Sequence, residues 1–188
     1  GVAMVFAGLN MANADPMSLI KVADLVRNGR PMKVEASASS IKDGDAMHYK
    51  FDLPASGYLN VVNIGPDGDA TVLFPNAYQK DNRVRVGSFE LPPKGANYSL
   101  YAGAPWGQSL TAAFLSEEPI NLYEASPSHA DGKPMVFAPA RINAINKIEN
   151  LSPKGNIRPS GNQEKAEVAP YWAGSVEATV CSKNNVCQ

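Results

Sequence analysis

The sequence predicts an all-β or β-rich fold, an Ig-like antiparallel sandwich with an N-terminal helix and a C-terminal extension. Several short segments alternate apolar and polar residues, which is the pattern of half-buried strands. Gly and Pro, with 15 residues each in a chain of 188, supply the turns between these segments. A chain of this length is expected to form one domain, or one domain with an additional tail. It is long enough to bury a hydrophobic core without extra crosslinks.

Residues 1–30 are expected to form an N-terminal segment and a helix. Asp15-Pro16 is a helix-start signal, the apolar residues from Leu19 to Val26 have helical spacing, and Asn28-Gly29 is a stop signal. We therefore expect one amphipathic helix that packs on the sheet.

Before this helix, the apolar run Val2–Leu9 and the small residues of Ala12-Asn13-Ala14 resemble the end of a signal peptide. The usual basic region is missing from it. Residues 1–14 are therefore interpreted either as a signal-peptide remnant or as an ordinary part of the fold.

Residues 31–118 are expected to form the sandwich core. A hairpin is predicted over 57–74, because β-branched and aromatic runs flank Pro66-Asp67-Gly68, where proline presets φ and glycine accepts a positive φ. Pro75 has no N–H to donate and ends the second strand. Further short strands are predicted at 34–38, 47–51, 84–89, 98–102 and 110–115.

A set of short motifs in this core resembles a bacterial family, the domain of unknown function 4384, over about residues 34–117. The motifs are Gly57-Tyr58-Leu59, Pro66-Asp67-Gly68, Leu73-Phe74-Pro75-Asn76, Tyr78-Gln79, Asp81-Asn82, Val84, Gly87 and Leu91-Pro92. The resemblance implies a small β-rich module, often attached to kinase-like or caspase-like enzyme domains or to secretion machinery. No such enzyme domain is visible in this sequence, and the family supplies no catalytic residues to carry over.

Residues 119–170 are expected to form a loop-rich linker with a short helix at 140–150, where isoleucines recur three apart. Residues 171–188 are expected to form a C-terminal strand over 171–181, with a possible bulge at Gly174, followed by a disulfide hairpin.

Cys181 and Cys187 would face each other if 183–185 form a three-residue loop, because Asn184-Asn185 tolerates left-handed backbone. The alternative, a metal or redox pair, is disfavoured because five intervening residues match neither a Cys-x-x-Cys motif nor a zinc knuckle. A disulfide would indicate an oxidising compartment, the periplasm or the cell exterior.

Catalytic and metal chemistry have few candidate residues. A hydrolase would need His48 or His129 beside a nucleophile, and the sequence contains no Gly-x-Ser-x-Gly elbow. Two acidic turns offer oxygen ligands for calcium, but Asp-Gly is also the usual hairpin turn and neither matches a calcium-binding loop. The weak calcium candidates are Asp43, Asp45, Asp67 and Asp69. No cofactor is expected.

The candidate binding residues are Trp106, Tyr78, Phe74, Asn76 and Asn82. Trp106 follows Pro105 at a predicted loop tip, whereas Trp172 is expected to be buried. The segment Phe74–Tyr78 offers aromatic rings beside a proline for peptide or glycan stacking. The alternative for this segment is structural, with Phe74 in the core and Asn76 and Asn82 holding the loop backbone.

The charge balance limits the partners. A net charge of −1 gives no case for nucleic acid or an anionic membrane, and no apolar run is long enough to span a bilayer. We expect a non-catalytic accessory or adaptor module that binds another protein, through loops or a sheet edge, in a bacterial envelope or secretion assembly. The alternatives are a cell-wall glycan or peptide-binding module using Trp106 and Tyr78, and a hydrolase.

Overall fold

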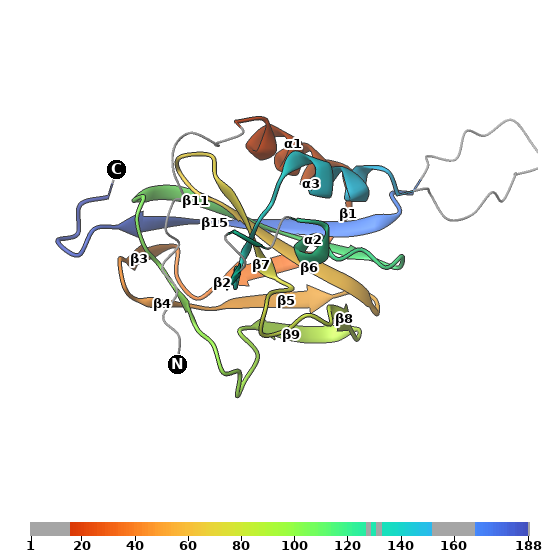
Figure 1. The fold of residues 1–188 in the computed structure, drawn as a ribbon, viewed down its shortest axis with the longest axis horizontal. Helices are drawn as coiled ribbons and strands as arrows, with labels where there is room; N and C mark the ends of the chain where they lie inside the picture. The colour runs from red at the N-terminus through yellow and green to blue at the C-terminus, as the bar shows by residue number, and fades with distance from the viewer. Residues whose placement is uncertain (1–15, 127–128, 131–132, 152–167, 188) are drawn as a thin grey trace, which may run out of the picture.

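A large sheet forms the centre of the computed structural model, which describes residues 16–126, 129–130, 133–151 and 168–187. Its eight strands run in the order β1-β15-β11-β6-β7-β14, with β3 also paired to β15 and β8 to β6 (Figure 1). They are β1 (Arg30–Pro31), β3 (Ser40–Lys42), β6 (Gly57–Ile64), β7 (Ala70–Phe74), β8 (Arg83–Val84), β11 (Gly107–Ser116), β14 (Ala138–Pro139) and β15 (Tyr171–Cys181). The predicted hairpin over 57–74 is confirmed as β6 and β7.

A three-stranded antiparallel sheet packs on one face of the large sheet. It consists of β2 (Lys33–Ala36), β5 (Tyr49–Leu53) and β9 (Gly87–Leu91). Its inward side chains, Phe51 and Leu91 among them, join Leu59, Leu73 and Leu115 of the large sheet in one hydrophobic core. The fold is therefore β-rich and sandwich-like, as predicted.

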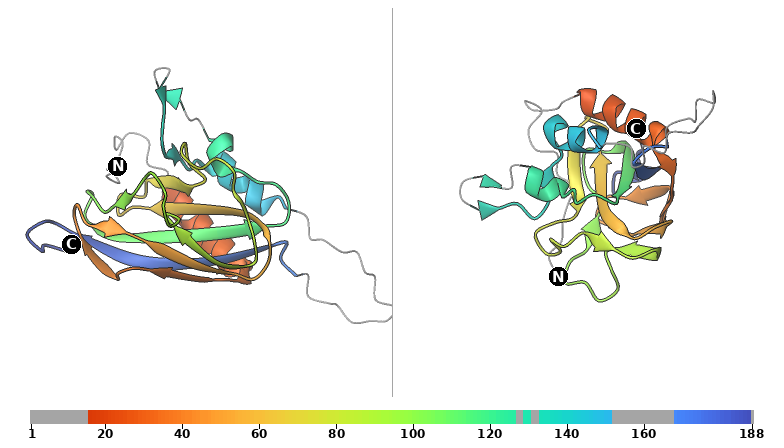
Figure 2. Two further views of the ribbon diagram at one scale, coloured as in Figure 1. Left: turned by 90° about the horizontal axis from the view of Figure 1, so that it is seen from below. Right: turned by 90° about the vertical axis from the view of Figure 1, so that its right-hand side faces the viewer.

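Helices cover the opposite face of the large sheet. They are α1 (Pro16–Asn28), α2 (Leu122–Ala125) and α3 (Ile142–Glu149) (Figure 2). Val22 and Ile145 are buried there against Val62 and Phe114, because both helices present an apolar stripe to the sheet. The helices predicted near 15–28 and 140–150 are thus confirmed as α1 and α3. None of the helices in the described residues has the length and apolarity that crossing a bilayer requires.

Two segments that were each predicted as one strand form two strands, which pair with different neighbours. The segment 47–51 breaks at His48, because β4 (Ala46–Met47) pairs with β10 (Leu100–Tyr101) while β5 pairs with β2 and β9. The segment 84–89 divides into β8, in the large sheet, and β9, in the small one. Gly87, at φ 119°, lies where the chain passes from one to the other.

β15 is confirmed at the predicted position, but the bulge expected at Gly174 is wrong. Gly174 lies opposite Ala113 in an unbroken register with β11. A Cβ atom at this position would lie 1.9 Å from the Met32 carbonyl oxygen, so glycine is required by the close approach of the chain between β1 and β2. β15 also forms short parallel pairs with β1 and β3, which a purely antiparallel sandwich would lack.

Much of the segment 119–170 packs against the same sheet. β14 pairs with β7, and α2 and α3 lie on the helical face. A further short hairpin, β12 (His129–Ala130) with β13 (Lys133–Pro134), precedes β14. Residues 1–14, interpreted above as a signal-peptide remnant or as part of the fold, lie outside the described residues, as do residues 152–167.

Candidate functional site

The Asp67 carboxylate takes part in the β6–β7 turn itself. The Gly68 N–H donates to the Gly65 carbonyl at 3.0 Å, and the Asp69 N–H donates to Asp67 Oδ1 at 3.1 Å. Gly68 has φ 84°, as the predicted turn requires. Burial, and then the neighbouring Asp67 carboxylate, raise the pKa of Asp69. The turn is thus shaped by the Asp67 carboxylate and by the backbone groups of Asp69.

The other acidic turn lies beside Trp106. The Asp45 N–H donates to the Lys42 carbonyl at 3.0 Å, and Asp43 Oδ2 accepts a hydrogen bond from Trp106 Nε1 at 3.3 Å. Trp106 is 39% exposed, so the ring is held at the surface by this contact. Within the described ranges, no three His, Cys, Asp or Glu side chains lie close enough together to hold a metal ion.

The loop after β7 is organised by Asn76, which is fully buried. Its Nδ2 donates to the Leu73 carbonyl at 2.9 Å, and its Oδ1 accepts from the Tyr78 and Gln79 amides, both at 3.0 Å. Phe74 is also fully buried, with its ring centroid 5.1 Å from that of Phe89. Neither Phe74 nor Asn76 can therefore contact a ligand in this conformation.

Asn82 is buried as well, at the end of the same loop. Its Nδ2 donates to the Ile120 carbonyl at 2.7 Å and to the Leu59 carbonyl at 3.1 Å. Asn60 Nδ2 donates to the same Ile120 oxygen at 3.0 Å. The two carboxamides tie the loop and β6 to the segment that leads into α2, which is the structural role that the sequence left open for Asn82.

The candidate aromatic residues have separate surroundings. Tyr78 is 40% exposed and stacks on buried Tyr98, with ring centroids 5.8 Å apart, whereas Trp106 lies beside the turn after β3. Trp172 is half-buried, and the Arg30 guanidinium carbon lies 3.4 Å from its ring centroid. Each aromatic ring therefore already has a neighbour within the fold.

His48 lies exposed between β4 and β5. The Ser37 hydroxyl accepts a hydrogen bond from the His48 backbone N–H at 3.1 Å and contacts Met47 Sδ at 3.4 Å. The Ser37 hydroxyl is thus engaged in a hydrogen bond with the backbone. The side chain of His129 lies outside the described residues.

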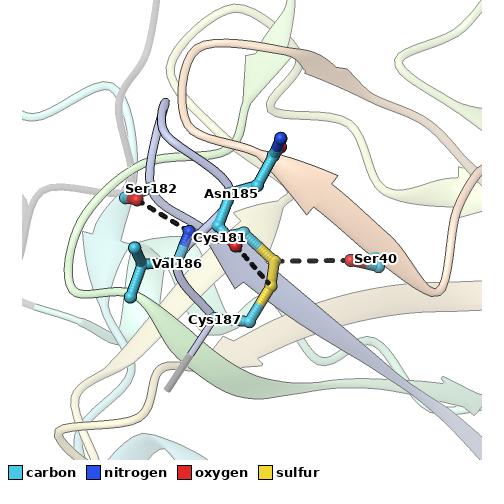
Figure 3. The surroundings of a disulfide bond; sticks show 6 residues. All are labelled: Ser40, Cys181, Ser182, Asn185, Val186 and Cys187. Atoms are coloured by element: carbon cyan, nitrogen blue, oxygen red, sulfur yellow. Dashed lines mark hydrogen bonds between the residues drawn. A yellow bond between two sulfur atoms is a disulfide. The ribbon is translucent and has the colours of Figure 1, made fainter.

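The predicted disulfide between Cys181 and Cys187 is present, with Cα atoms 4.3 Å apart (Figure 3). The Asn185 N–H donates to the Ser182 carbonyl at 2.9 Å, and Asn185 has φ 63°, as predicted for this turn. Ser40 Oγ lies 3.4 Å from Cys181 Sγ, so the crosslink lies against β3.

Two surface grooves, of about 310 and 710 Å³, flank the helices. The larger one has Asn82 and Ile120 in its lining, with charged side chains around them, including Lys80, Glu118 and Lys147. Neither Trp106 nor Tyr78 lines either groove.

The strand β9 forms one edge of the small sheet, with β2 at the other, and no further strand of the described chain pairs with β9. Along an antiparallel strand, backbone N–H and C=O groups point alternately to the two sides. The Ser37 N–H donates to the His48 carbonyl at 2.8 Å, and this pair continues the β2–β5 register, in which Ala36 lies opposite Tyr49. The backbone groups of Tyr49 and the other odd-numbered residues of β5 therefore point toward β9.

The partners of these odd-numbered residues in β9 are Gly87, Phe89 and Leu91. The backbone groups of Ser88 and Glu90 consequently point outward, at the open edge. The edge is short, because the Val86 N–H donates to Ser56 Oγ at 3.0 Å and Pro92 has no N–H.

The end strands of the large sheet differ from β9 in one respect. β1 contains Pro31 and β14 contains Pro139, and a proline in an edge strand removes a donor that another chain would need. β9 contains no proline. The sequence predicted a strand here but not that it would be an edge, because which strands pair is decided by contacts distant in sequence. The only local sign of an open edge in the sequence is the absence of proline from the β9 residues that precede Pro92.

Comparison with known families gives one match. Residues 40–119 match the family described as Domain of unknown function (DUF4384), which confirms the resemblance expected from the sequence motifs. Comparisons with curated proteins and with solved structures give no match.

Proposed function

We propose that this chain, whose residues 40–119 match that family, is a non-catalytic adaptor module that binds another protein by strand addition at β9. The observation that carries the proposal is the outward direction of the Ser88 and Glu90 backbone groups on a proline-free edge. In strand addition, main-chain hydrogen bonds supply affinity and alternate side chains supply specificity.

The side chains of β9 suit this role. Ser88 and Glu90 are exposed on the solvent face of the sheet, while Phe89 on the core face is only half-buried. The Phe89 ring packs on Phe51 and Phe74, at centroid distances of 6.1 and 5.1 Å. An added strand would therefore place alternate side chains beside an apolar ring and beside polar groups.

We place the protein in the periplasm or the cell exterior, within a bacterial envelope or secretion assembly. The disulfide between Cys181 and Cys187 supports an oxidising compartment. The assembly rests on the family resemblance, because that family is often attached to secretion machinery.

The glycan-binding alternative has less support. A glycan platform needs exposed aromatic rings side by side, whereas Tyr78 stacks on Tyr98 and Trp106 bonds Asp43 in another loop. The hydrolase alternative gains no support from His48, because the Ser37 hydroxyl bonded to its backbone N–H also contacts Met47 Sδ.

The test compares two substitutions at one residue in the native host. Glu90→Pro removes the outward N–H without touching a β5–β9 hydrogen bond, and Glu90→Ala changes the side chain alone. We expect the tagged wild-type chain and Glu90→Ala to co-purify the same protein after crosslinking, and Glu90→Pro to lose it. Co-purification that survives Glu90→Pro, in a variant whose thermal unfolding matches wild type, would contradict the proposal.

A further inference from the structure

Two exposed cations flank the open edge of β9. Arg85 precedes it and Lys94 follows it, and neither joins an ion pair within the described residues. By contrast, Arg83 bonds Asp81 at 3.4 Å. Lys94 lies in a tight turn, in which the Ala96 N–H donates to the Pro93 carbonyl at 3.0 Å. Both ends of the edge therefore carry uncompensated positive charge.

The middle of the edge, in contrast, carries a negative charge, which disfavours an acidic residue in an added strand. Glu90 is exposed on the solvent face and lies opposite Lys50 in the register with β5. A residue added on the other side of Glu90 would be its direct cross-strand neighbour, where like charges are destabilising. An acidic residue is therefore favoured at the ends of an added segment and disfavoured at its centre.

A second copy of the chain fits this pattern poorly. If two β9 strands paired around Phe89, Ser88 of each copy would lie opposite Glu90 of the other. The same pairing would bring Arg85 of each copy near Lys94 of the other. Symmetry repeats this repulsion at both ends, so self-association is disfavoured.

We propose that the partner presents an extended segment with acidic residues at both ends and uncharged residues between them, one of which is apolar and faces Phe89. This inference rests on the proposed strand addition at β9 and specifies its partner. The flanking charges steer the encounter and set the register, while the backbone bonds of Ser88 and Glu90 hold the segment.

The experiment uses labelled nonapeptides with a common centre of alternating threonine and valine. One has two aspartates at each end, one has serines and one has lysines. Fluorescence anisotropy with the full chain at about 0.02 M salt should give binding at least about tenfold tighter for the aspartate peptide than for the lysine peptide, and the ratio should shrink at about 0.5 M salt. The double variant Arg85→Glu with Lys94→Glu should reverse the order, and Glu90→Pro should abolish binding of every peptide.

A charge-matched control is the double variant Lys42→Glu with Lys183→Glu, which alters exposed cations near the disulfide and should keep the wild-type order. Equal affinity for the three peptides, lost in Glu90→Pro, would overturn the acidic partner and leave strand addition standing. Binding that persists in Glu90→Pro, or no binding by any peptide, would overturn both.

Discussion

The Asn82 side chain lies 2.7 Å from the Ile120 carbonyl oxygen, to which its Nδ2 donates a hydrogen bond. The same Nδ2 donates to the Leu59 carbonyl, and the Leu59 N–H donates back to the Asn82 carbonyl at 2.9 Å. One buried carboxamide thus joins the loop before β8, the strand β6 and the segment that leads into α2. Asn82 thus fixes the loop between β7 and β8 to the large sheet.

Asn82→Asp should therefore destabilise the fold by about 3 kcal/mol at neutral pH, because a buried carboxylate would face two carbonyl oxygens and has no proton to donate. At low pH the introduced carboxyl becomes protonated and recovers one donor, so the loss relative to wild type should shrink. Urea unfolding at pH 7 and pH 4 measures both values. Exposed Asn97→Asp is the control and should cost less than about 0.5 kcal/mol. An equally small cost for Asn82→Asp would refute this role.

Features decided by neighbouring residues could be predicted from the sequence. The turn at Pro66-Asp67-Gly68, the helix α1 and the pairing of Cys181 with Cys187 each depend on local spacing and on residues that tolerate a special φ. The structural alternative for Asn76 was likewise readable, because a short amide next to proline commonly bonds its own loop.

Features that depend on pairing between distant segments could not be predicted from the sequence. Nothing in the alternation around His48 reveals that Met47 and Tyr49 belong to different sheets. The open edge at β9 and the requirement for glycine at position 174 also depend on which segments meet. Met32 and Gly174, for example, are 142 positions apart in the sequence. The candidate site is therefore formed by backbone groups of β9 rather than by loop aromatic residues such as Trp106, and only the absence of proline before Pro92 marks it in the sequence.

Gly174→Ala should destabilise the fold by about 2–4 kcal/mol, because the added methyl group would overlap the Met32 carbonyl and push β1 from β15. The Met32 N–H donates to the Ala173 carbonyl at 2.9 Å, and this bond would be weakened as well. Thermal and urea unfolding measure the loss. Ser175→Ala, at the next and exposed position of β15, should change stability by less than about 0.5 kcal/mol. A tolerated Gly174→Ala would show that the close approach can relax.

Removing the disulfide, by reduction or by Cys181→Ser with Cys187→Ser, should cost about 2 kcal/mol, because it closes only a short loop. The expected result is a lower urea midpoint with the fold retained, since β15 keeps its pairing with β11. The pairing itself is checked by alkylation without reductant, followed by mass measurement. Two labels on the folded chain would contradict a disulfide between these residues.

The buried phenol of Tyr49 should make the folded state less stable at high pH. Burial raises the pKa of its phenol from 10.0 to about 12, although the hydrogen bond from Thr111 Oγ1, at 3.0 Å, favours the ionised form. The unfolded chain therefore releases this proton at lower pH than the folded chain does. The stability that the neutral phenol contributes is complete below pH 10 and is lost as the pH rises from 10 toward 12.

The loss attributable to Tyr49 should reach about 2–3 kcal/mol by the upper end of this range, since each unit of pKa difference corresponds to about 1.4 kcal/mol. Burial also raises the pKa values of Tyr98, Tyr123 and Tyr171. The measured quantity is therefore the difference in unfolding free energy between wild type and Tyr49→Phe from pH 9 to pH 12. That difference should shift steadily in favour of Tyr49→Phe as the pH rises. Val86→Ala, at an exposed position without an ionisable group, should give a nearly constant difference. A constant difference for Tyr49→Phe as well would mean that water reaches the phenol, and that the contact between the two sheets at Tyr49 and Thr111 is looser than the hydrogen bond implies.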